Sequence, residues 1–498
     1  MVNRNTGKVS LGIAILIACV LCTVSSLHAQ TYSQLAVFDG ADGDRPLASV
    51  IQGTDGNLYG TTHAGGIGTC PGNCGVVFKV TPQGQLTTIY EFCAKGGACI
   101  DGQYPDANLL LGKDGNLYGT TSYGGKIPKG DSGVPSGTVF RITAEGKFHS
   151  IYSFCKIWPC PDGAQPEAAL IQGTDGDFYG TTYNGGTAPY GSNAGTIFKI
   201  TAAGKLTTLY NFCSQQNCTD GLHPYAALVQ GTDGNFYGTA TDGGICVGDC
   251  DPFEDVGVIF KITPSGDYTV LYSFCSQANC PDGANPETAL IQATDGNFYG
   301  TAHSGGTDIA GTVFKITPGG TFSVVQGSGF FYPNGLVQGT DGNFYGTTAN
   351  GGAGNSGGVF QITPAGELTF EYSFCNCGSD GEGPEAGVFQ ATNGTFYGTT
   401  TGGFGTSSDG TVYSLSMGLA PFVQAVPGAG KVGNTIKIIG TELAGVSSVT
   451  FNGLPATYTQ VSDTEITAKV PKKATTGLIK VGIPSGTLSS NVAFQVIK

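Results

Sequence analysis

The segment Gly53-Thr-Asp-Gly-Asn-Leu-Tyr-Gly60 decides the fold, because it recurs seven times along the chain. Its third position falls at Asp55, Asp114, Asp175, Asp233, Asp295, Asp341 and Asn393, at intervals of 59, 61, 58, 62, 46 and 52 residues. Apolar strand patterns follow each copy, as at residues 76–81 and 206–212 of the first and third units. Asp-Gly supplies the positive φ that a tight hairpin turn requires. Together with the strand patterns, these turns predict four short antiparallel strands in each unit.

Tandem units of this length with four strands each are typical of β-propeller blades. The seventh unit ends with its third strand at residues 411–415, whereas residues 32–38 have the pattern of a fourth strand. Pairing of these two segments would remove exposed sheet edges. We therefore predict an all-β, seven-bladed β-propeller with four-stranded blades, whose N-terminal strand closes the last blade. A β-helix or other stack of repeats is the alternative. The repeated Tyr59 and its equivalents are expected to pack between blades.

Composition excludes several classes of protein. Of the 498 residues, 83 are Gly and only 12% are charged, which argues against a helical protein because Gly weakens helix interiors. The hydrophobic content of 40%, with 28 Phe and 22 Tyr, is enough to bury a core and argues against disorder. The net charge of −14 argues against a nucleic-acid partner, because it would repel a phosphate backbone.

Residues 1–29 have the organisation of a secretory signal peptide. A basic start precedes an apolar stretch over residues 11–24, and Leu27-His28-Ala29 resembles a cleavage site before Gln30. We therefore predict a secreted or cell-surface protein with no transmembrane span after cleavage, since no later segment has about 18 consecutive apolar residues. Lipidation of Cys19 is the alternative, although the apolar stretch continues beyond it.

The 14 cysteines of the mature chain fall into seven close pairs. These are Cys70/Cys74, Cys93/Cys99, Cys155/Cys160, Cys213/Cys218, Cys246/Cys250, Cys275/Cys280 and Cys375/Cys377. An even number with local pairing in an exported chain predicts disulfides that close short loops. Zinc coordination by two such pairs is the alternative. The last pair fits a disulfide least well, because a single intervening residue forces a strained geometry.

The repeat stops near residue 420. Residues 420–498 contain no Cys and carry a net charge of +4, and segments such as 433–440 and 466–471 alternate apolar and polar residues. About seven short strands of this kind predict an immunoglobulin-like β-sandwich. We place the domains at residues 1–29, 30–418 and 419–498, which leaves a net charge of about −20 on the repeat region.

The repeated pattern D-G-N-[LF]-Y-G-T-T, Gly-Gly and V-F-K-I-T-P-x-G resembles that of exported bacterial GloVer-type proteins, also called choice-of-anchor tandem repeat proteins, over residues 32–417. This resemblance implies export and surface attachment without a known reaction. The C-terminal segment resembles the IPT/TIG module on Gly433-Asn-Thr-Ile-Lys-Ile-Ile-Gly440 and Val449-Thr-Phe-Asn-Gly453. The repeats are more distantly similar to streptogramin lyase propellers, but no acid and histidine constellation carries over.

The connections that carry the Cys pairs emerge on one face of such blades. We predict that this face binds a ligand, because function on β scaffolds concentrates in variable loops. Six blades have Asp-Gly-x-x-Pro before the inner strand, and Trp158 lies between Cys155 and Cys160. The candidate ligand-binding residues are therefore Asp42, Asp101, Asp162, Asp220, Asp282, Asp380 and Trp158. Asp-Gly turn chemistry is the alternative role for the six Asp residues.

Further carboxylates, Asp106, Glu167, Glu287 and Glu385, follow some of the same prolines. A ring of carboxylates around a channel mouth attracts cations, so Ca²⁺ is the candidate metal, and no other cofactor is expected.

The function must be predicted without a catalytic motif. The few histidines have no nucleophile or carboxylate at a recognisable motif spacing. Repeated positions look alike from blade to blade, which favours a scaffold over an active site. We therefore predict an exported, non-catalytic, monomeric protein that binds an extracellular polysaccharide or a surface protein. The alternative is an extracellular polysaccharide lyase or hydrolase that uses carboxylates at the propeller channel mouth.

Overall fold

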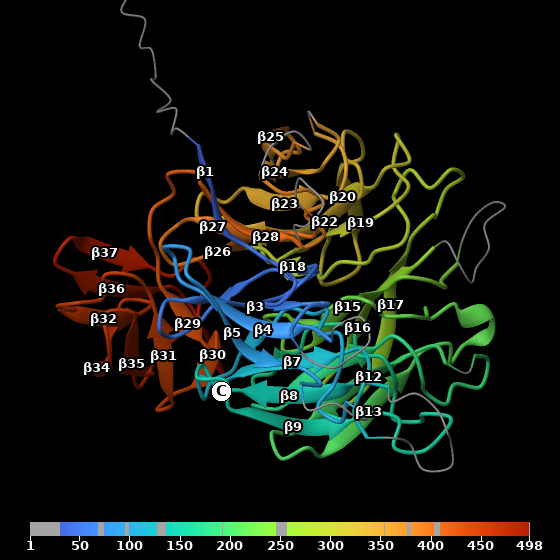
Figure 1. Ribbon diagram of the computed structural model, residues 1–498, viewed down its shortest axis with the longest axis horizontal. Helices are drawn as coiled ribbons and strands as arrows, with labels where there is room; N and C mark the ends of the chain where they lie inside the picture. The colour runs from blue at the N-terminus through green and yellow to red at the C-terminus, as the bar shows by residue number, and fades with distance from the viewer. Residues whose placement is uncertain are drawn as a thin grey trace, which may run out of the picture.

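The computed structural model describes residues 30–67, 74–94, 99–126, 136–191, 193–245, 256–352, 354–375, 380–402 and 409–497. Over these residues the protein is all-β, and its one helical element is the short 3-10 turn η1 (Gln216–Cys218) (Figure 1). Within this part of the chain, no helix is long and apolar enough to cross a membrane. The predicted signal peptide, with Cys19, lies outside the described residues.

Residues 31–416 form four-stranded antiparallel sheets, and seven of them lie in the described part of this region. Sheet 1 contains β2 (Ile51–Gln52), β3 (Leu58–Thr62), β4 (Val76–Val80) and β5 (Leu86–Glu91). Sheet 2 contains β6 (Leu110–Leu111), β7 (Leu117–Thr121), β8 (Thr138–Ile142) and β9 (Phe148–Ser153). Sheet 3 contains β10 (Ile171–Gln172), β11 (Phe178–Thr182), β12 (Thr196–Ile200) and β13 (Leu206–Asn211). Sheet 4 contains β14 (Val229–Gln230), β15 (Phe236–Ala240), β16 (Val258–Ile262) and β17 (Tyr268–Ser273).

The remaining three sheets continue the same order. Sheet 5 contains β18 (Ile291–Gln292), β19 (Phe298–Ala302), β20 (Thr312–Ile316) and β21 (Phe322–Gln326). Sheet 6 contains β22 (Pro333–Gln338), β23 (Phe344–Thr348), β24 (Gly358–Ile362) and β25 (Leu368–Ser373). Sheet 7 contains β26 (Phe389–Gln390), β27 (Phe396–Thr400), β28 (Thr411–Ser416) and β1 (Thr31–Val37), which is antiparallel to β28. The predicted pairing of the N-terminal strand with the last repeat is therefore confirmed.

The repeated Asp-Gly turn joins the first two strands of sheets 1 to 6, and Asn393-Gly394 takes its place in sheet 7. In sheet 1, Asp55 accepts hydrogen bonds from the Asn57 backbone N–H (3.2 Å) and from the Tyr59 hydroxyl (2.8 Å), and Gly56 takes a φ of +79°. A carboxylate that bonds the following backbone stabilises such a turn. The structural role of this Asp thus extends to fixing the tyrosine of the second strand.

Neighbouring sheets are held together by aromatic side chains. The tyrosine of one second strand packs on the phenylalanine that begins the next one, as in Tyr118–Phe178 and Tyr237–Phe298, with ring centroids 4.2 and 4.0 Å apart. The predicted packing of these tyrosines between repeats is therefore confirmed. A comparable apolar cluster joins the last sheet to the first, through Tyr397 and Val412 on one side and Phe78 on the other.

A glutamine at the end of the innermost strand adds a polar link between sheets. Its Oε1 accepts a hydrogen bond of 2.9 to 3.2 Å from a turn N–H of the preceding sheet. The pairs are Gln172–Lys113, Gln230–Thr174, Gln292–Thr232, Gln338–Thr294, Gln390–Thr340 and Gln52–Thr392, the last of which joins sheets 7 and 1. At the junction of sheets 1 and 2, Leu111 occupies the glutamine position.

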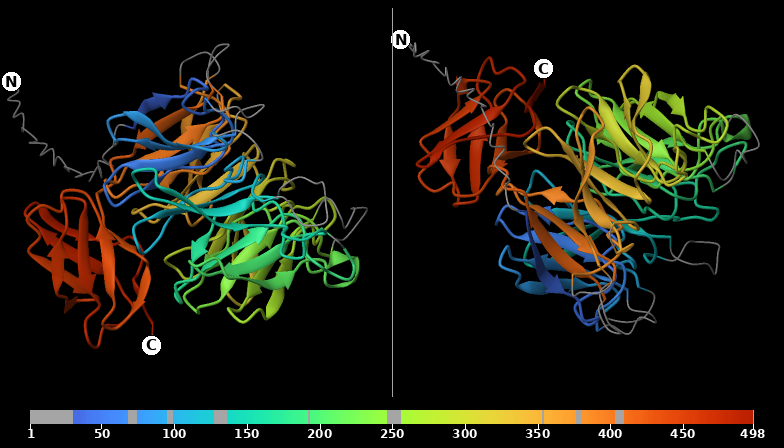
Figure 2. Two further views of the ribbon diagram at one scale, coloured as in Figure 1. Left: turned by 60° about the horizontal axis from the view of Figure 1, so that its bottom comes forward. Right: turned by 90° about the horizontal axis from the view of Figure 1, so that it is seen from above.

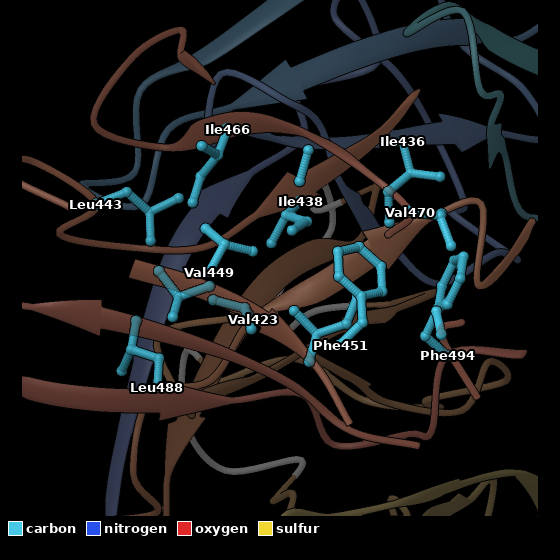
Figure 3. Packing of buried hydrophobic residues seen from close by; sticks show 14 of the residues in the cluster. Val423, Ile436, Ile438, Leu443, Val449, Phe451, Ile466, Val470, Leu488 and Phe494 are labelled. Carbon is cyan, nitrogen blue, oxygen red and sulfur yellow. The ribbon is translucent and has the colours of Figure 1, made fainter. Parts of the chain in front are cut away.

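Residues 424–497 form a smaller body beside the repeat sheets (Figure 2). One of its sheets contains β29 (Gln424–Val426), β31 (Thr435–Ile439), β35 (Glu465–Lys469) and β34 (Tyr458–Gln460). The other contains β33 (Leu454–Pro455), β32 (Ser448–Phe451), β36 (Ile479–Ile483) and β37 (Gly486–Ser489), while β30 (Ala429–Lys431) pairs with β38 (Gln495–Ile497). The core between them includes Ile438, Val449, Phe451 and Ile466 (Figure 3), which gives the predicted immunoglobulin-like arrangement.

This C-terminal module contacts the end of the repeat sheets that carries the Asp-Gly turns, which we call the hairpin end. The Phe422 N–H donates to the Thr392 carbonyl (2.8 Å), and the Asn491 side chain donates to the Gln338 carbonyl (3.0 Å). The Thr464 hydroxyl donates to the Thr54 carbonyl (2.8 Å), which lies in the Asp-Gly turn of sheet 1. This turn receives no glutamine from sheet 2, because sheet 2 has Leu111 at that position. The module therefore contacts the one junction that lacks the glutamine link.

The glutamine links predict a measurable loss of stability when one is removed. Gln230→Leu deletes the acceptor of the Thr174 N–H and the donor to the Gly234 carbonyl, so we expect the free energy of unfolding to fall by about 1 kcal/mol. Gln83→Leu, in an exposed turn, is the matched control and should change it by less than about 0.5 kcal/mol. Urea unfolding of both variants tests this, and equal stabilities would contradict a structural role of the link.

Candidate functional site

Disulfides gather at the end of the sheets opposite the hairpin end, which we call the disulfide end. The predicted pairs Cys93–Cys99, Cys155–Cys160, Cys213–Cys218 and Cys275–Cys280 are confirmed. Cys74 and Cys375 are also disulfide-bonded, whereas Cys70, Cys246, Cys250 and Cys377 lie outside the described residues. Each confirmed bridge closes the loop that follows the outermost strand of its sheet.

Five of the six candidate Asp residues accept hydrogen bonds within their own sheet. Asp220 is fully buried and accepts from the Tyr210 hydroxyl (2.5 Å) and the Ser214 N–H (2.8 Å). Equivalent tyrosine hydroxyls donate to Asp101 and Asp162 at 2.8 Å, to Asp282 at 2.7 Å and to Asp380 at 2.8 Å. These bonds tie each disulfide loop to the outer strand. A ligand-binding role for these residues stays a prediction.

The remaining two candidates lie at the surface or near it. Asp42 accepts a hydrogen bond from the Asp39 N–H (2.9 Å) in the first turn. Trp158 is 61% exposed in the loop closed by Cys155–Cys160. Its exposure leaves it accessible to a ligand, and that role also stays a prediction.

Three positions of each sheet at the disulfide end differ from sheet to sheet. Each sheet has a proline shortly before its first strand or at the start of it, at Pro46 in sheet 1 and at the equivalent position in the others. The residue before this proline has a φ between 51° and 63° in every sheet and is Arg45, Tyr104, Gln165, His223, Asn285, Tyr332 or Gly383. The residue after this proline is Leu47, Asp106, Glu167, Tyr225, Glu287, Asn334 or Glu385. The residue after the second strand is His63, Ser122, Tyr183, Thr241, His303, Ala349 or Thr401. The expectation that repeated positions look alike therefore does not hold for these residues.

Histidines at these positions form three similar contacts across sheet junctions. Each imidazole stacks on a tyrosine of the neighbouring sheet, in the pairs His63–Tyr104, His223–Tyr183 and His303–Tyr332, with ring centroids 4.5 to 4.6 Å apart. Each Nδ1 also faces a carboxylate: Asp106 at 2.6 Å, Asp242 at 2.8 Å and Glu287 at 3.5 Å, in the same order. A carboxylate on one ring nitrogen orients the imidazole and leaves Nε2 for another partner.

A cavity of about 510 Å³ opens among residues of sheets 2 to 5, and we call it the mouth cavity. Its lining consists of Tyr123, Gln165, Glu167, Tyr183, Asn184, Tyr225, Thr241 and Glu287. Gln165 donates to the Tyr123 hydroxyl and accepts from the Asn184 side chain, so polar groups of two sheets form a continuous chain. The volume is in the range of small-molecule binding sites.

Burial raises the pKa of three carboxyl groups at the disulfide end. Burial, together with the charge of Asp106, raises the pKa of Glu167 to about 7. Burial also raises the pKa of Glu287 despite the neighbouring His303, and that of Glu385 despite Arg45 and His63. Clustered acids of this kind are typical of sites that bind or transfer positive charge.

Tyr225 lies where the charges of several of these acids act together. Burial raises its pKa, and the charges of Glu167, Asp106, Glu287 and Glu385 raise it further. The four carboxylates come from four different sheets, so the field at Tyr225 belongs to the assembled molecule and not to one repeat.

The described residues bring possible metal ligands close together in one place. There, the only group of at least three His, Cys, Asp or Glu side chains with ligand atoms within 4.8 Å of one another is Cys74, Cys93 and Cys99. All three are disulfide-bonded, so they do not offer thiolates. The predicted Ca²⁺ stays untested at the carboxylates of the mouth cavity.

The histidine contacts are the functional feature that sequence reasoning missed. His63 and Asp106 are 43 residues apart, and His223 and Asp242 are 19 apart, so no local motif reveals either pair. The signal was present in the alignment of repeats, since His63 and His303 follow equivalent strands and Asp106 and Glu287 follow equivalent prolines.

Comparison with known proteins assigns the class of the chain. Residues 21–250 and 129–328 match the Gloeobacter/Verrucomicrobia repeat, so the chain belongs to this repeat family, and residues 421–496 match the IPT/TIG domain. No curated protein matches the chain. Among solved structures, that of a gluconolactonase candidate is 12% identical over 56% of this chain and 80% of its own, with a TM-score of 0.32.

The raised pKa of Glu167 predicts a pH-dependent stability. The pKa of this carboxyl group is ordinarily 4.5 and is about 7 in the folded chain. Its stabilising contribution to the free energy of unfolding is therefore complete below pH 4.5 and is lost as the pH rises through 7. Glu167→Gln removes this loss. We therefore expect the Tm of the variant, relative to that of the wild type, to increase as the pH rises over this interval. Thermal unfolding at several pH values measures the difference.

A matched control has the opposite sign. Hydrogen bonding by Thr143 lowers the pKa of Glu145, which is fully exposed. The Tm of Glu145→Gln should therefore be slightly lower than that of the wild type above the ordinary pKa of a glutamate. A Tm difference for Glu167→Gln that does not change with pH would contradict the burial of Glu167, which is the main cause of its raised pKa.

Proposed function

We propose that this protein is an exported ligand-binding protein in which residues 30–418 form a closed, seven-bladed β-propeller and residues 419–498 an immunoglobulin-like module. Closure is supported by the β1–β28 pairing, by the Gln52–Thr392 hydrogen bond and by the apolar cluster that joins sheets 7 and 1. Export is supported by the character of residues 1–29 and by disulfides, which persist in oxidising compartments. Surface attachment through a lipidated Cys19 is the alternative to cleavage before Gln30.

The binding site in this proposal is the mouth cavity at the disulfide end. One observation carries it: the residues that differ between sheets place phenols, carboxyl groups and side-chain amides together around this cavity, at Gln165, Glu167, Tyr183, Tyr225, Thr241 and Glu287. Other variable residues, such as His63 and Tyr104, join neighbouring sheets, whereas Tyr225 and Glu287 border the cavity and can contact a ligand. The hairpin end is an unsuitable entrance, since the C-terminal module packs against it.

The proposed ligand is an extracellular polysaccharide, with a surface protein as the other candidate. Tyrosines, carboxylates and side-chain amides together suit sugars, because rings stack on aromatic faces and hydroxyls need polar partners. The disulfides of the surrounding loops lower the entropy cost of binding, since these loops are ordered beforehand.

Retention of the mature chain on a panel of insoluble polysaccharides tests this function. Tyr225→Ala should lower the affinity about tenfold, because Tyr225 is 40% exposed on the cavity wall. Tyr190→Ala is the matched control, since Tyr190 is exposed and does not line the cavity, and it should bind as the wild type does. Repeating the measurement with Ca²⁺ and with a chelator tests the metal.

Absence of retention on every polysaccharide, or an equal loss in both tyrosine variants, would contradict the proposal.

A second candidate function is polysaccharide hydrolysis or lyase activity, and Glu167 favours it. A carboxyl group with a pKa of about 7 is half protonated at neutral pH and suits a general acid, while the neighbouring Asp106 supplies a second carboxyl group. The same panel distinguishes the two functions. New reducing ends or unsaturated products that disappear in Glu167→Gln would establish the enzyme, and retention without product would support the binding protein.

A further inference from the structure

The mouth cavity has an excess of negative charge. Glu167 and Glu287 line it, and its described lining includes no Lys or Arg. Glu287 faces the imidazole of His303 at 3.5 Å, and the charges of Asp106 in sheet 2 and Glu385 in sheet 7 also act on Tyr225. A ligand that brings positive charge would therefore be attracted and would relieve the repulsion among these acids.

Aromatic faces adjoin the same carboxylates. The rings of Tyr183 and Tyr225 are nearly perpendicular, at 88°, with centroids 6.2 Å apart. His223 stacks on Tyr183, so that ring is held in place, while Tyr225 is exposed to the cavity. Ammonium groups bind between tyrosine faces and carboxylates, because both supply negative potential.

Neutral hydrogen-bonding groups complete the lining and point to the rest of the ligand. Gln165 and Asn184 contribute side-chain amides beside the Tyr123 hydroxyl. Thr241 also lines the cavity, and its hydroxyl is buried, at 8% residue exposure, without a hydrogen-bond partner among the described residues. A buried hydroxyl is costly unless it is paired, so a ligand with hydroxyl groups has an advantage over a plain alkyl ammonium chain.

We propose that the mouth cavity binds an amino sugar with a free ammonium group, as a unit of a deacetylated polysaccharide. The ammonium group lies between Tyr225 and the carboxylates of Glu167 and Glu287, and the sugar hydroxyls bond the amides and Thr241. This inference rests on the proposed binding function and names its ligand class. It differs from a bare acidic cluster, because aromatic rings, side-chain amides and Thr241, with its buried, unpaired hydroxyl, line the same cavity.

Calorimetric titration of the mature chain with two oligosaccharides of equal length tests the proposal. One is an oligomer of glucosamine, at a pH where its amines are protonated, and the other is the corresponding oligomer of N-acetylglucosamine. We expect the free amine to bind at least about tenfold more tightly and to lose affinity as salt is added, because charge attraction is screened.

A pair of variants separates charge recognition from general damage. Glu287→Gln should lose about tenfold in affinity for the glucosamine oligomer and little for the acetylated one. Glu367→Gln, in an exposed turn at the hairpin end, should bind both as the wild type does. If Glu287→Gln does not fold, Glu167→Gln provides the same comparison.

The outcomes distinguish this inference from the proposed function. Equal affinities for the two oligomers, or an equal loss of both in Glu287→Gln, would overturn the amino-sugar assignment and leave polysaccharide binding intact. Tighter binding of a lysine oligopeptide than of the glucosamine oligomer would overturn the sugar class. No binding of either oligomer or of any polysaccharide on the panel would overturn both proposals.

Discussion

The packing of one tyrosine against the next sheet is the interaction on which the rest of the structure depends. The tyrosine hydroxyl is fixed by the aspartate of its own turn, as in Tyr118–Asp114, and its ring lies on the phenylalanine of the following sheet. Each sheet alone has a buried second strand that needs apolar cover on both faces, so successive sheets must stack. The glutamine links add direction to this stacking, because each bonds a turn of the preceding sheet.

The last sheet of the series takes its fourth strand from the N-terminus of the chain, because β1 pairs with β28. Tyr32 of β1 stacks on Tyr372 of sheet 6 with ring centroids 4.1 Å apart, as Tyr268 of sheet 4 stacks on Tyr210 of sheet 3 at 3.9 Å. β1 therefore occupies the place of an ordinary fourth strand. The disulfide end presents related loops from each sheet, and at sheets 2 to 5 their variable positions bring unlike residues to the mouth cavity.

Much of the fold was predictable from sequence, because the repeated segment states both the turn and the strand that follows it. Strand pairing, the role of Tyr59 and its equivalents, and the local disulfides all follow from contacts within one repeat or between adjacent ones. The candidate site was less predictable. The position of the mouth residues was visible in Asp-Gly-x-x-Pro, but the pairing of His63 with Asp106 depends on how two sheets pack. Likewise, the contact of Thr464 with the Leu111 junction joins segments 410 residues apart and has no local signal.

Hydrogen exchange of the β1 backbone amides tests closure of the propeller most directly. Residues 31–37 pair with residues 411–416, so we predict that a peptide covering β1 is protected from exchange as strongly as one covering β9 or β13. Exchange of β1 at the rate of an unstructured peptide, with the other outer strands protected, would contradict a closed ring and leave the last sheet with an open edge.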